Sequence, residues 1–218
     1  MEQGPDHVGL IPDGLRRWAR SHDTTLAEAY LRGAHKVVEI MLALQRHGVR
    51  TVTVYNLSRA NLTRTPEELD AVYQASLHFL TTLVPANFDA TVCSLRLHGD
   101  RKALPDSYVA AAHDLEVTMT GAAFRINLLA AYDAYDELRD AARRTQRDET
   151  SDIASAFDIG AVDLVIRTTP EPLLSGFPPL QSQYALLRFL TTPLNDLTVR
   201  HIDDLIADYR ALPQLRGR

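Results

Sequence analysis

Residues 7–18 read HVGLIPDGLRRW, an apolar run that ends in Asp13-Gly14 and passes at once into a basic segment. The apolar run over 7–12 is typical of a buried strand, and Asp-Gly after it predicts a tight turn into a helix. Ligands of open α/β sheets bind at the carboxyl ends of the strands, and a helix start with arginines beside it favours a phosphate group. The stretch alone fits equally well an aspartate that caps a helix, followed by surface arginines.

Composition places the chain among globular proteins. Its 218 residues are 45 % hydrophobic and 23 % charged, and the formal net charge of -5 argues against a nucleic-acid partner. Cys93 is the single cysteine, which fits a reducing cytoplasm. The sequence shows no signal peptide and no apolar run near the roughly 18 residues of a membrane span. We therefore expect one domain over 1–218, located in the cytoplasm, without a membrane span.

Apolar periodicity alternates between strand and helix along the chain. Strands are predicted at about 7–12, 51–57, 90–97, 123–129, 162–167 and 184–190. Helices are predicted at about 26–45, 65–84, 107–118 and 197–212, with a charged helix that ends near 147 and a short helix over 151–157. This alternation predicts the α/β class, with a mostly parallel sheet of about six strands flanked by helices.

Three of the predicted strands end in polar residues. The first strand is followed by Asp13, Gly14 and Arg17, the second by Ser58, Asn61 and Arg64, and the fifth by Arg167, Glu171 and Ser175. Guanidinium groups match phosphate oxygens, and an aspartate among them could hold Mg²⁺ together with phosphate oxygens and water. A single arginine is more often a solvated surface residue, so the shared position at strand ends is what favours a phosphate or diphosphate site.

Other chemistries lack their sequence signals. The chain has no G-x-G-x-x-G or Walker motif, no G-x-S-x-G motif, and no histidine or cysteine spacing typical of a metal site. Asp203-Asp204 and Asp208 belong to an amphipathic helix near the C-terminus, and we interpret them as its solvated face.

Four segments, in order, resemble the signatures of the cis-prenyltransferases of the undecaprenyl diphosphate synthase type. They are 7–20, with a strand followed by Asp-Gly, 55–68, with an aromatic residue and a serine before Asn61, 126–138, and 162–196, with Asp-Leu-Val-Ile-Arg-Thr. The resemblance implies that family's fold and its reaction, in which an allylic diphosphate is condensed with isopentenyl diphosphate in the presence of Mg²⁺. It also implies a homodimer.

The resemblance assigns roles to the residues at the strand ends. Asp13, Gly14 and Arg17 match family residues that hold the allylic diphosphate and its Mg²⁺, and Asn61 matches an asparagine of the condensation step with Arg64 nearby. Arg167 and Ser175 match residues of the isopentenyl diphosphate site. Asp13 and Asn61 are thus the predicted catalytic residues, and Asp13 is the predicted metal ligand. An apolar tunnel for the growing chain would be lined by Leu69, Val72, Tyr73, Leu77 and Leu80, although their spacing equally fits a helix packed on a sheet.

The sequence departs from the family pattern at several of these places. Leu15-Arg16 replaces Asn-Gly, Leu26 and Tyr30 replace an arginine and a histidine, Ala60 and Leu62 replace a glutamate and a tryptophan, Asp133 and Tyr135 replace a glycine and an arginine, Thr169-Pro170 replaces Gly-Gly, Leu173 replaces an arginine and Leu186 replaces a glutamate. Each lost charged contact to a phosphate costs about 1.5–3 kcal/mol, so the isopentenyl site is the more weakened one and processive long-chain synthesis is not expected.

Three functions remain open at this point. The first is a divergent enzyme that ionises an allylic prenyl diphosphate for a short or irregular prenyl transfer or a cyclisation. The second is a catalytically silent partner subunit, in a heteromer with an active homologue. The third is an ordinary chain-elongating polyprenyl diphosphate synthase. Retention of Asp13, Arg17, Asn61, Arg64 and Arg167 favours the first. The substrate chain length and the product skeleton are not encoded in any motif.

Overall fold

Six parallel strands form the centre of the molecule. The computed structural model describes residues 4–146 and 152–212. The strands are β1 (His7–Ile11), β2 (Thr51–Ser58), β3 (Cys93–His98), β4 (Phe124–Tyr132), β5 (Leu164–Arg167) and β6 (Leu186–Phe189). They lie side by side in the order β3-β4-β2-β1-β5-β6, and every neighbouring pair is parallel. The prediction of an α/β fold with a parallel six-stranded sheet is confirmed.

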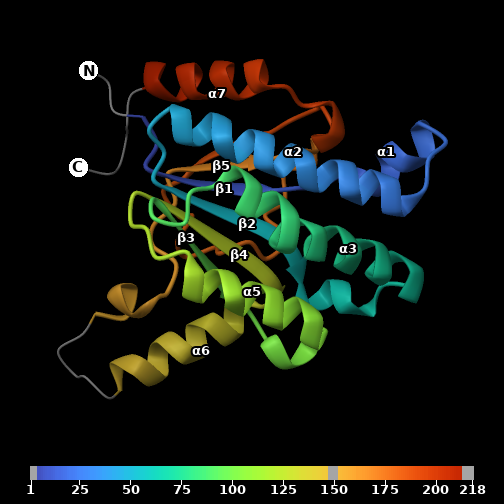
Figure 1. Cartoon of the computed structure of the whole chain (residues 1–218). Helices are drawn as coiled ribbons and strands as arrows, with labels where there is room; N and C mark the ends of the chain where they lie inside the picture. The colour runs from blue at the N-terminus through green and yellow to red at the C-terminus, as the bar shows by residue number, and fades with distance from the viewer. Residues whose placement is uncertain (1–3, 147–151, 213–218) are drawn as a thin grey trace.

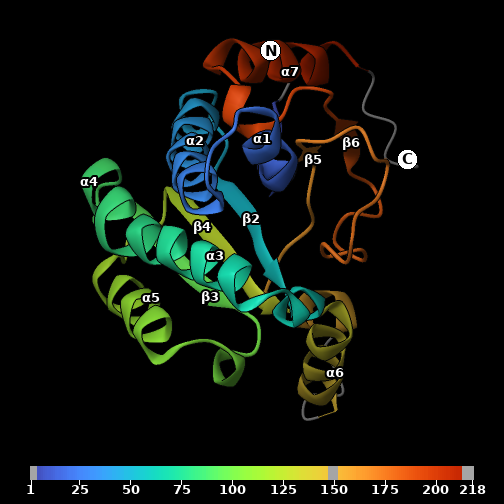
Figure 2. The same ribbon diagram turned by 90° about the vertical axis from the view of Figure 1, so that its right-hand side faces the viewer.

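Helices cover one face of this sheet. The helices of the described chain are α1 (Leu15–Ser21), α2 (Leu26–Arg46), α3 (Pro66–His78), α4 (Val84–Asn87), α5 (Asp106–Thr118), α6 (Ala134–Thr145) and α7 (Val199–Ala211). Of these, α6 packs instead on the opposite face, through Ala134. Figures 1 and 2 show α7, α2, α3 and α5 next to one another in that order over the sheet. The opposite face is covered by residues 152–163 and 168–185, where Ile159, Val162 and Phe177 pack on Ile11 and Tyr55. That segment has little regular structure beyond a short 3₁₀ helix, Ile153–Ala156.

Local signals set most of the element boundaries. The Thr25 side chain accepts a hydrogen bond from the Glu28 backbone, and the Glu28 carboxylate reaches back, which forms a capping box at the start of α2. Thr65 caps α3, where Pro66 stands at the first helical position as predicted. The predicted helix over 65–84 continues through a π-helical turn, Phe79–Leu83, into α4. The helix predicted to end near 147 is α6, and residues 147 and 151 lie outside the described chain.

Two strand boundaries differ from the sequence prediction by three residues, and the others differ by two residues or fewer. β3 begins at Cys93 rather than 90, because the Asp89 carboxylate accepts hydrogen bonds from the backbone and the hydroxyl of Thr91 and holds a turn there. β4 continues to Tyr132 rather than 129, because its partner β2 pairs with it as far as Ser58 despite an irregularity in register. The three residues added to β4 are buried, which carries the strand to the edge where the site lies.

The strand β1 has a central place in the sheet. All five of its residues are buried, and it pairs with β2 on one side and with β5 on the other. The three strands whose ends carry the predicted polar residues are therefore direct neighbours. Parallel strands end at the same edge, so the loops after β2, β1 and β5 meet there.

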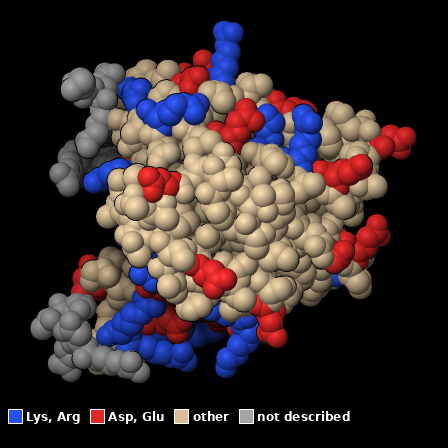
Figure 3. All heavy atoms as spheres, viewed as in Figure 1, with Lys and Arg blue, Asp and Glu red and all other residues tan. Residues whose placement is uncertain are grey.

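The surface seen in Figure 3 carries charges of both signs. Acidic and basic side chains alternate around the rim of this face, and its middle is a broad area with few charged groups. Among the helices of residues 4–146 and 152–212, none is long and apolar enough to cross a membrane.

Candidate functional site

A cavity of about 950 Å³ lies where the ends of β1, β2 and β5 meet. Each of the three strand ends contributes one residue to its polar lining. These residues are Asp13 after β1, Ser58 of β2 and Arg167 of β5. Its apolar lining comes from α2, α3 and the sheet, with Ala34, Val37, Val54, Val72, Ala75, Phe79 and Leu128. The cavity therefore combines a polar region at the strand ends with an apolar region between the helices and the sheet.

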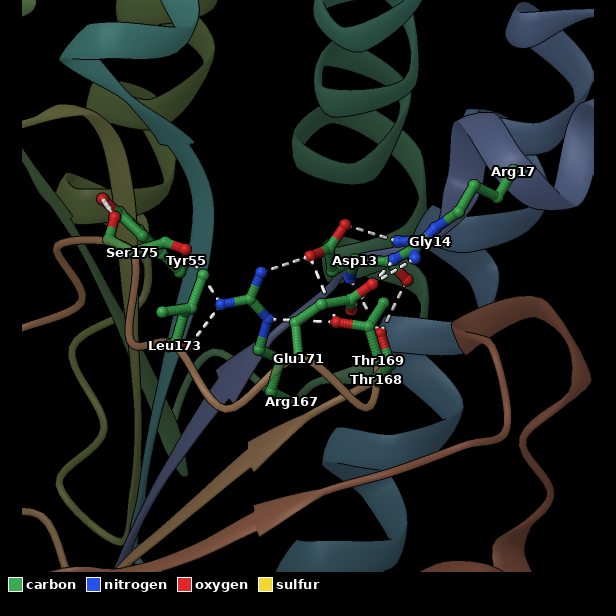
Figure 4. A network of polar contacts seen from close by, with 10 residues as sticks. All are labelled: Asp13, Gly14, Arg17, Tyr55, Arg167, Thr168, Thr169, Glu171, Leu173 and Ser175. Atoms are coloured by element: carbon green, nitrogen blue, oxygen red, sulfur yellow. Dashed lines mark hydrogen bonds and ion pairs between the residues drawn. The ribbon is translucent and has the colours of Figure 1, made fainter.

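Asp13 is bound on both sides of its carboxylate, as Figure 4 shows. Its Oδ1 accepts a hydrogen bond from the backbone nitrogen of Gly14 at 2.6 Å, and its Oδ2 accepts from Arg167 Nη2 at 2.7 Å and from Thr169 Oγ1 at 3.3 Å. The hydroxyl of Thr168 accepts from the Asp13 nitrogen at 2.7 Å and lies 2.8 Å from the Asp13 carbonyl oxygen. The loops after β1 and β5 thus hold one carboxylate, 36 % exposed, at the cavity wall.

The structure decides between the two interpretations of the opening stretch. The N-cap of α1 is Gly14, whose backbone is left-handed with φ 89°, and no side chain caps this helix. Asp13 instead turns toward Arg167, so it belongs to the cavity rather than to a helix cap. A Cβ on Gly14 would lie 3.2 Å from Thr169 Cγ2, which together with the positive φ favours glycine here.

Arg167 is a fixed cation in the wall of the cavity. Its side chain is only 8 % exposed. Its Nε donates to Thr169 Oγ1 at 3.1 Å, and its Nη1 donates to Ser175 Oγ at 2.8 Å and to the Leu173 carbonyl. With Nη2 on Asp13, all three nitrogens of the guanidinium have protein partners. The predicted pair of Arg167 and Ser175 is therefore brought together, with a backbone oxygen in addition.

Tyr55 holds the loop that carries Ser175. Its hydroxyl donates to the Ser175 carbonyl at 3.0 Å, and Ser175 itself has a positive φ of 52°. Burial raises the pKa of Tyr55 to about 12, so the hydroxyl stays a neutral donor. The ring of Tyr55 meets those of Tyr132 and Phe177 edge-on, which fixes its direction.

Arg17 lies at the mouth of the cavity and pairs with Glu171. Both of its terminal nitrogens donate to the two carboxylate oxygens, the longer contact being 3.2 Å. The hydrogen bond from Arg17 lowers the pKa of Glu171 to about 2. Both side chains are well exposed, and exposed ion pairs contribute little to stability, so this pair can open when an anion enters.

Asn61 and Arg64 follow β2, as predicted. Asn61 lies in a 3₁₀ helix, Arg59–Thr63, where its nitrogen donates to Ser58 Oγ and its Oδ1 accepts from the Ser58 nitrogen. The side-chain oxygen of Asn61 is thus used to cap the 3₁₀ helix. Asn61 also lines the cavity, where its side-chain nitrogen is left to donate. Arg64 Nη1 lies 2.9 Å from Glu68 Oε1 and donates to the Tyr30 hydroxyl at 3.3 Å.

Of the five residues predicted to line an apolar tunnel, one lines this cavity. Only Val72 lines the cavity, and the other lining residues of this helical region are Ala75, Ser76 and Phe79. Positions 72, 75, 76 and 79 share one helical face. The residues outside the lining are Leu69, Tyr73, Leu77 and Leu80. Tyr73 meets the ring of Tyr108 on α5, and Leu80 is fully buried in the core. Large apolar residues fill the contacts between elements, whereas the small Ala75 and Ser76 leave space for the cavity.

Several residues that complete the site were not predicted. Thr168 and Tyr55 lie in the segments that resemble the family, but the sequence assigned them no role, because they act through hydrogen bonds to residues far away in the chain. Asp133, which departs from the family pattern, caps α6 by accepting from Tyr135 and Asp136 nitrogens. Tyr135 is exposed, so it lies away from the core. The side chain of Leu173 is also exposed, but the residue lines the cavity and its carbonyl binds Arg167.

Comparison with known proteins identifies the family. Residues 11–215 match the family model described as putative undecaprenyl diphosphate synthase. The chain is 33 % identical to a (2Z,6E)-farnesyl diphosphate synthase of Mycobacterium tuberculosis, over 98 % of this chain and 88 % of that protein. It is 26 % identical to an isoprenyl transferase of Lactococcus lactis, over 94 % of this chain and 90 % of that protein. The chain belongs to the undecaprenyl diphosphate synthase family of cis-prenyltransferases, which confirms the predicted family and its transferase class.

Two solved structures share the fold. One is a lavandulyl diphosphate synthase from Lavandula x intermedia in complex with dimethylallyl diphosphate, with a TM-score of 0.89 and 24 % identity over 99 % of both chains. The other is a probable undecaprenyl diphosphate synthase from Campylobacter jejuni, with a TM-score of 0.83 and 22 % identity over 100 % of both chains. At this level of identity, the likeness establishes the fold alone, in agreement with the parallel six-stranded sheet described above.

Proposed function

We propose that this protein transfers a prenyl group from an allylic prenyl diphosphate, in a short or irregular condensation of the cis-prenyltransferase kind. The observation that carries the proposal is the cavity at the strand ends, in which the Asp13–Arg167 pair borders an apolar region between α2, α3 and the sheet. Such a cavity suits a ligand with an anionic head and a hydrocarbon tail. Relatives named (2Z,6E)-farnesyl diphosphate synthase and short-chain Z-isoprenyl diphosphate synthase support a short product.

The residues of the cavity supply what ionisation of an allylic diphosphate needs. The bond between the allylic carbon and the phosphate oxygen breaks, and its electron pair leaves with the diphosphate. Fixed cations such as Arg167, and Arg17 once it is released from Glu171, stabilise that developing charge. The double bond of the acceptor then forms the new carbon–carbon bond and a proton is lost. Apolar side chains such as Val72 and Phe79 exclude water from the cationic carbon.

Mg²⁺ belongs to this proposal as a metal shared between protein and substrate. No group of three metal-binding side chains exists in the described chain, so a site made of protein ligands alone does not fit. Mg²⁺ is commonly held by one or two carboxylates together with substrate phosphates and water. Asp13 fits that role because its Oδ1 accepts only the Gly14 nitrogen and keeps a free lone pair. Bound Mg²⁺ would neutralise part of the charge on the diphosphate.

We further propose a homodimer in the cytoplasm. The strand β6 is the last of the sheet on its side, and the exposed apolar side chains Leu180, Tyr184 and Leu187 lie on it or just before it. Such an edge favours association with a second chain. A heteromer with an active homologue is the alternative, and sedimentation of the purified protein alone, then mixed with a homologue, separates the two.

The reaction can be tested directly with the purified protein. It is incubated with Mg²⁺ and dimethylallyl, geranyl or farnesyl diphosphate, with and without isopentenyl diphosphate, while diphosphate release and products are measured. We expect release that falls at least about 100-fold in Asp13→Ala and is unchanged in Asp204→Ala, a matched change on the exposed face of α7. If no donor is turned over and the protein pairs stably with an active homologue, the silent-subunit hypothesis replaces this proposal.

A further inference from the structure

The cavity is lined by five arginines, and they differ in how far the protein itself occupies them. They are Arg16, Arg17, Arg20, Arg64 and Arg167. Arg167 uses all three nitrogens on protein groups, and Arg17 uses both terminal nitrogens on Glu171. Arg167 therefore supplies charge to a ligand but few free donors, whereas Arg17 is engaged only in an exposed ion pair. Further free donors for a diphosphate come from the remaining arginines.

Arg16 and Arg64 share a single carboxylate oxygen. Arg16 Nε lies 3.4 Å from Glu68 Oε1, and Arg64 Nη1 lies 2.9 Å from the same oxygen. Within residues 4–146 and 152–212, Arg16 donates no side-chain hydrogen bond, and Arg64 donates one, to Tyr30. Most of the N–H groups of this pair are therefore free. Two guanidiniums against one carboxylate also leave an excess of one positive charge in the cavity lining.

Glu68 is placed to hold this pair in position. It lies in the first turn of α3, its side chain is only 9 % exposed, and it receives Arg16 from α1 and Arg64 from the loop before its own helix. The Tyr30 hydroxyl of α2 lies 3.4 Å from Glu68 Oε1 and accepts from Arg64, so three helices meet at this carboxylate. Burial raises the pKa of Tyr30, which keeps its hydroxyl neutral.

A purely stabilising role explains this arrangement poorly. Arg16 is 56 % exposed, and ion pairs with such exposed partners add little stability. A carboxylate buried for that purpose carries a desolvation cost that the pair hardly offsets. A binding role explains it better. Glu68 holds two guanidiniums toward a cavity, and their free N–H groups have the fork geometry that matches phosphate oxygens. This role accounts both for the burial of Glu68 and for the sharing of its carboxylate by two arginines.

We infer that Arg16 is a diphosphate-binding residue of this cavity, that it acts together with Arg64, and that Glu68 is the positioning residue that holds the two guanidiniums as a pair. The inference rests on the proposed function, because the ligand is the diphosphate of the prenyl donor. The replacement of the phosphate-loop glycine by Arg16 is then a gain of a binding group. Leu26 and Tyr30, which replace an arginine and a histidine of the family pattern, line the same cavity.

The test measures binding and turnover separately. Inorganic diphosphate is titrated calorimetrically into the full-length protein with Mg²⁺, and Trp18, the single tryptophan, gives a second signal from α1. Arg16→Ala is expected to weaken diphosphate binding about 10-fold or more, the scale of one lost charged hydrogen bond. Arg200→Ala, the same change on the exposed face of α7, is expected to leave binding unchanged.

Glu68 is tested by a split between KM and kcat. Glu68→Gln is expected to raise the KM of the prenyl donor several-fold with little change in kcat, and Glu68→Asp is expected to restore part of it. Because Glu68 acts through Arg16 and Arg64, the effects of Arg16→Ala and Glu68→Gln on diphosphate binding are expected to be less than additive. If Glu68 had only a structural role, Glu68→Gln would lower the free energy of unfolding, and its effect on diphosphate binding would be additive with that of Arg16→Ala.

The outcomes separate this inference from the proposed function. Turnover of prenyl donors with unchanged diphosphate binding and unchanged KM in Arg16→Ala would overturn the inference and leave the function intact. Binding of diphosphate that depends on Arg16, without turnover of any prenyl donor, would support the paired site and overturn the proposed reaction.

Discussion

Arg167 Nη2 donates to Asp13 Oδ2 at 2.7 Å, although 154 residues separate the two in the sequence. The contact joins the loop after β5 to the loop after β1, and Figure 4 shows that the rest of the polar network is arranged around it. One partner is nearly buried and the other is a third exposed, so the pair brings a fixed cation and an accessible carboxylate into contact. The catalytic carboxylate that we propose is thus oriented by the cation beside it.

Removal of either partner should affect the other. In Arg167→Ala, Asp13 loses its counter-ion, and Thr169 and Ser175 each lose the hydrogen bond that Arg167 donates to them. Diphosphate release should therefore fall at least about 100-fold. Removal of one partner from a partly buried pair should also lower the free energy of unfolding, by about 1–3 kcal/mol. A double-mutant cycle with Asp13→Ala, followed by urea unfolding, should show that the two changes are strongly non-additive. Additive changes would show that the pair does not act as a unit.

Loss of the Tyr55 hydroxyl should loosen the Ser175 loop. Tyr55→Phe removes one hydrogen bond to a backbone oxygen, so the free energy of unfolding should fall by about 0.5–1.5 kcal/mol. The kcat/KM of prenyl transfer should fall as well, because Ser175 Oγ and the Leu173 carbonyl both hold Arg167. Tyr184→Phe, the same change on an exposed residue, is the control. Equal effects of the two changes would contradict a role for the Tyr55 contact.

Filling the cavity face of α3 should shorten the prenyl chains that the protein accepts. Ala75→Leu adds three carbons to a buried cavity-lining position, whereas Gln74→Leu places the same side chain on the exposed face one residue earlier. We expect Ala75→Leu to raise the KM of farnesyl diphosphate more than that of dimethylallyl diphosphate and to shift products, measured by mass spectrometry, to shorter chains. Gln74→Leu should change neither. Identical product distributions in both variants would place the hydrocarbon chain elsewhere.

Acid should destabilise the fold through the buried His7 and the partly buried His98. His7 Nδ1 lies 3.0 Å from the Ala161 carbonyl, which can only accept, so Nδ1 carries the proton and Nε2 accepts from the Thr53 hydroxyl at 2.7 Å. Asn127 bonds to that hydroxyl through Nδ2 and faces His98 Nε2 through Oδ1. Burial lowers the pKa of both histidines from 6.5.

The sign of this dependence follows from the lowered pKa values. Above pH 6.5 both histidines are neutral in the folded and the unfolded chain, whereas below it only the unfolded chain takes up the protons. The free energy of unfolding should therefore fall as the pH drops below 6.5, by at most about 1.4 kcal/mol per pH unit and histidine. Urea unfolding of His98→Gln should show a shallower fall than that of His113→Gln, an exposed control. A pH profile that is the same in both variants would contradict this account.

Gly9 should tolerate no side chain. A Cβ at this position would lie 2.3 Å from the Phe177 ring, whereas a Cβ on Gly160 would meet nothing within 4 Å. Gly9→Ala should lower the free energy of unfolding by about 1–3 kcal/mol, the usual cost of overpacking, and Gly160→Ala should not. Phe177→Leu in addition to Gly9→Ala should recover part of the loss, measured by urea unfolding. Failure of this rescue would place the strain elsewhere.

Sequence patterns were sufficient for the architecture, because their signals are local. Alternation of apolar strands with capped helices specifies an α/β chain, and signals such as the Thr65-Pro66 start act within one helical turn. The polar residues after the first, second and fifth strands were also visible, and so was the family resemblance that they carry. Two boundaries were predicted wrongly by three residues. Residues 90–92 lie in the turn that Asp89 holds rather than in β3, and residues 130–132 belong to β4 because they pair with β2.

Only the tertiary structure decided how these residues meet. The strand order puts β1 between β2 and β5, and that order brings Asp13 to Arg167, Tyr55 to Ser175 and Arg16 to Glu68. It also selected Val72, Ala75 and Ser76 of α3, and Phe79 just after it, rather than the larger leucines, as the face that lines the cavity. Such contacts join residues that are far apart in the chain, and they depend on the direction in which each side chain leaves its helix or strand. Local sequence signals reach only a few residues, so they determine the elements and leave the site to the packing of those elements against one another.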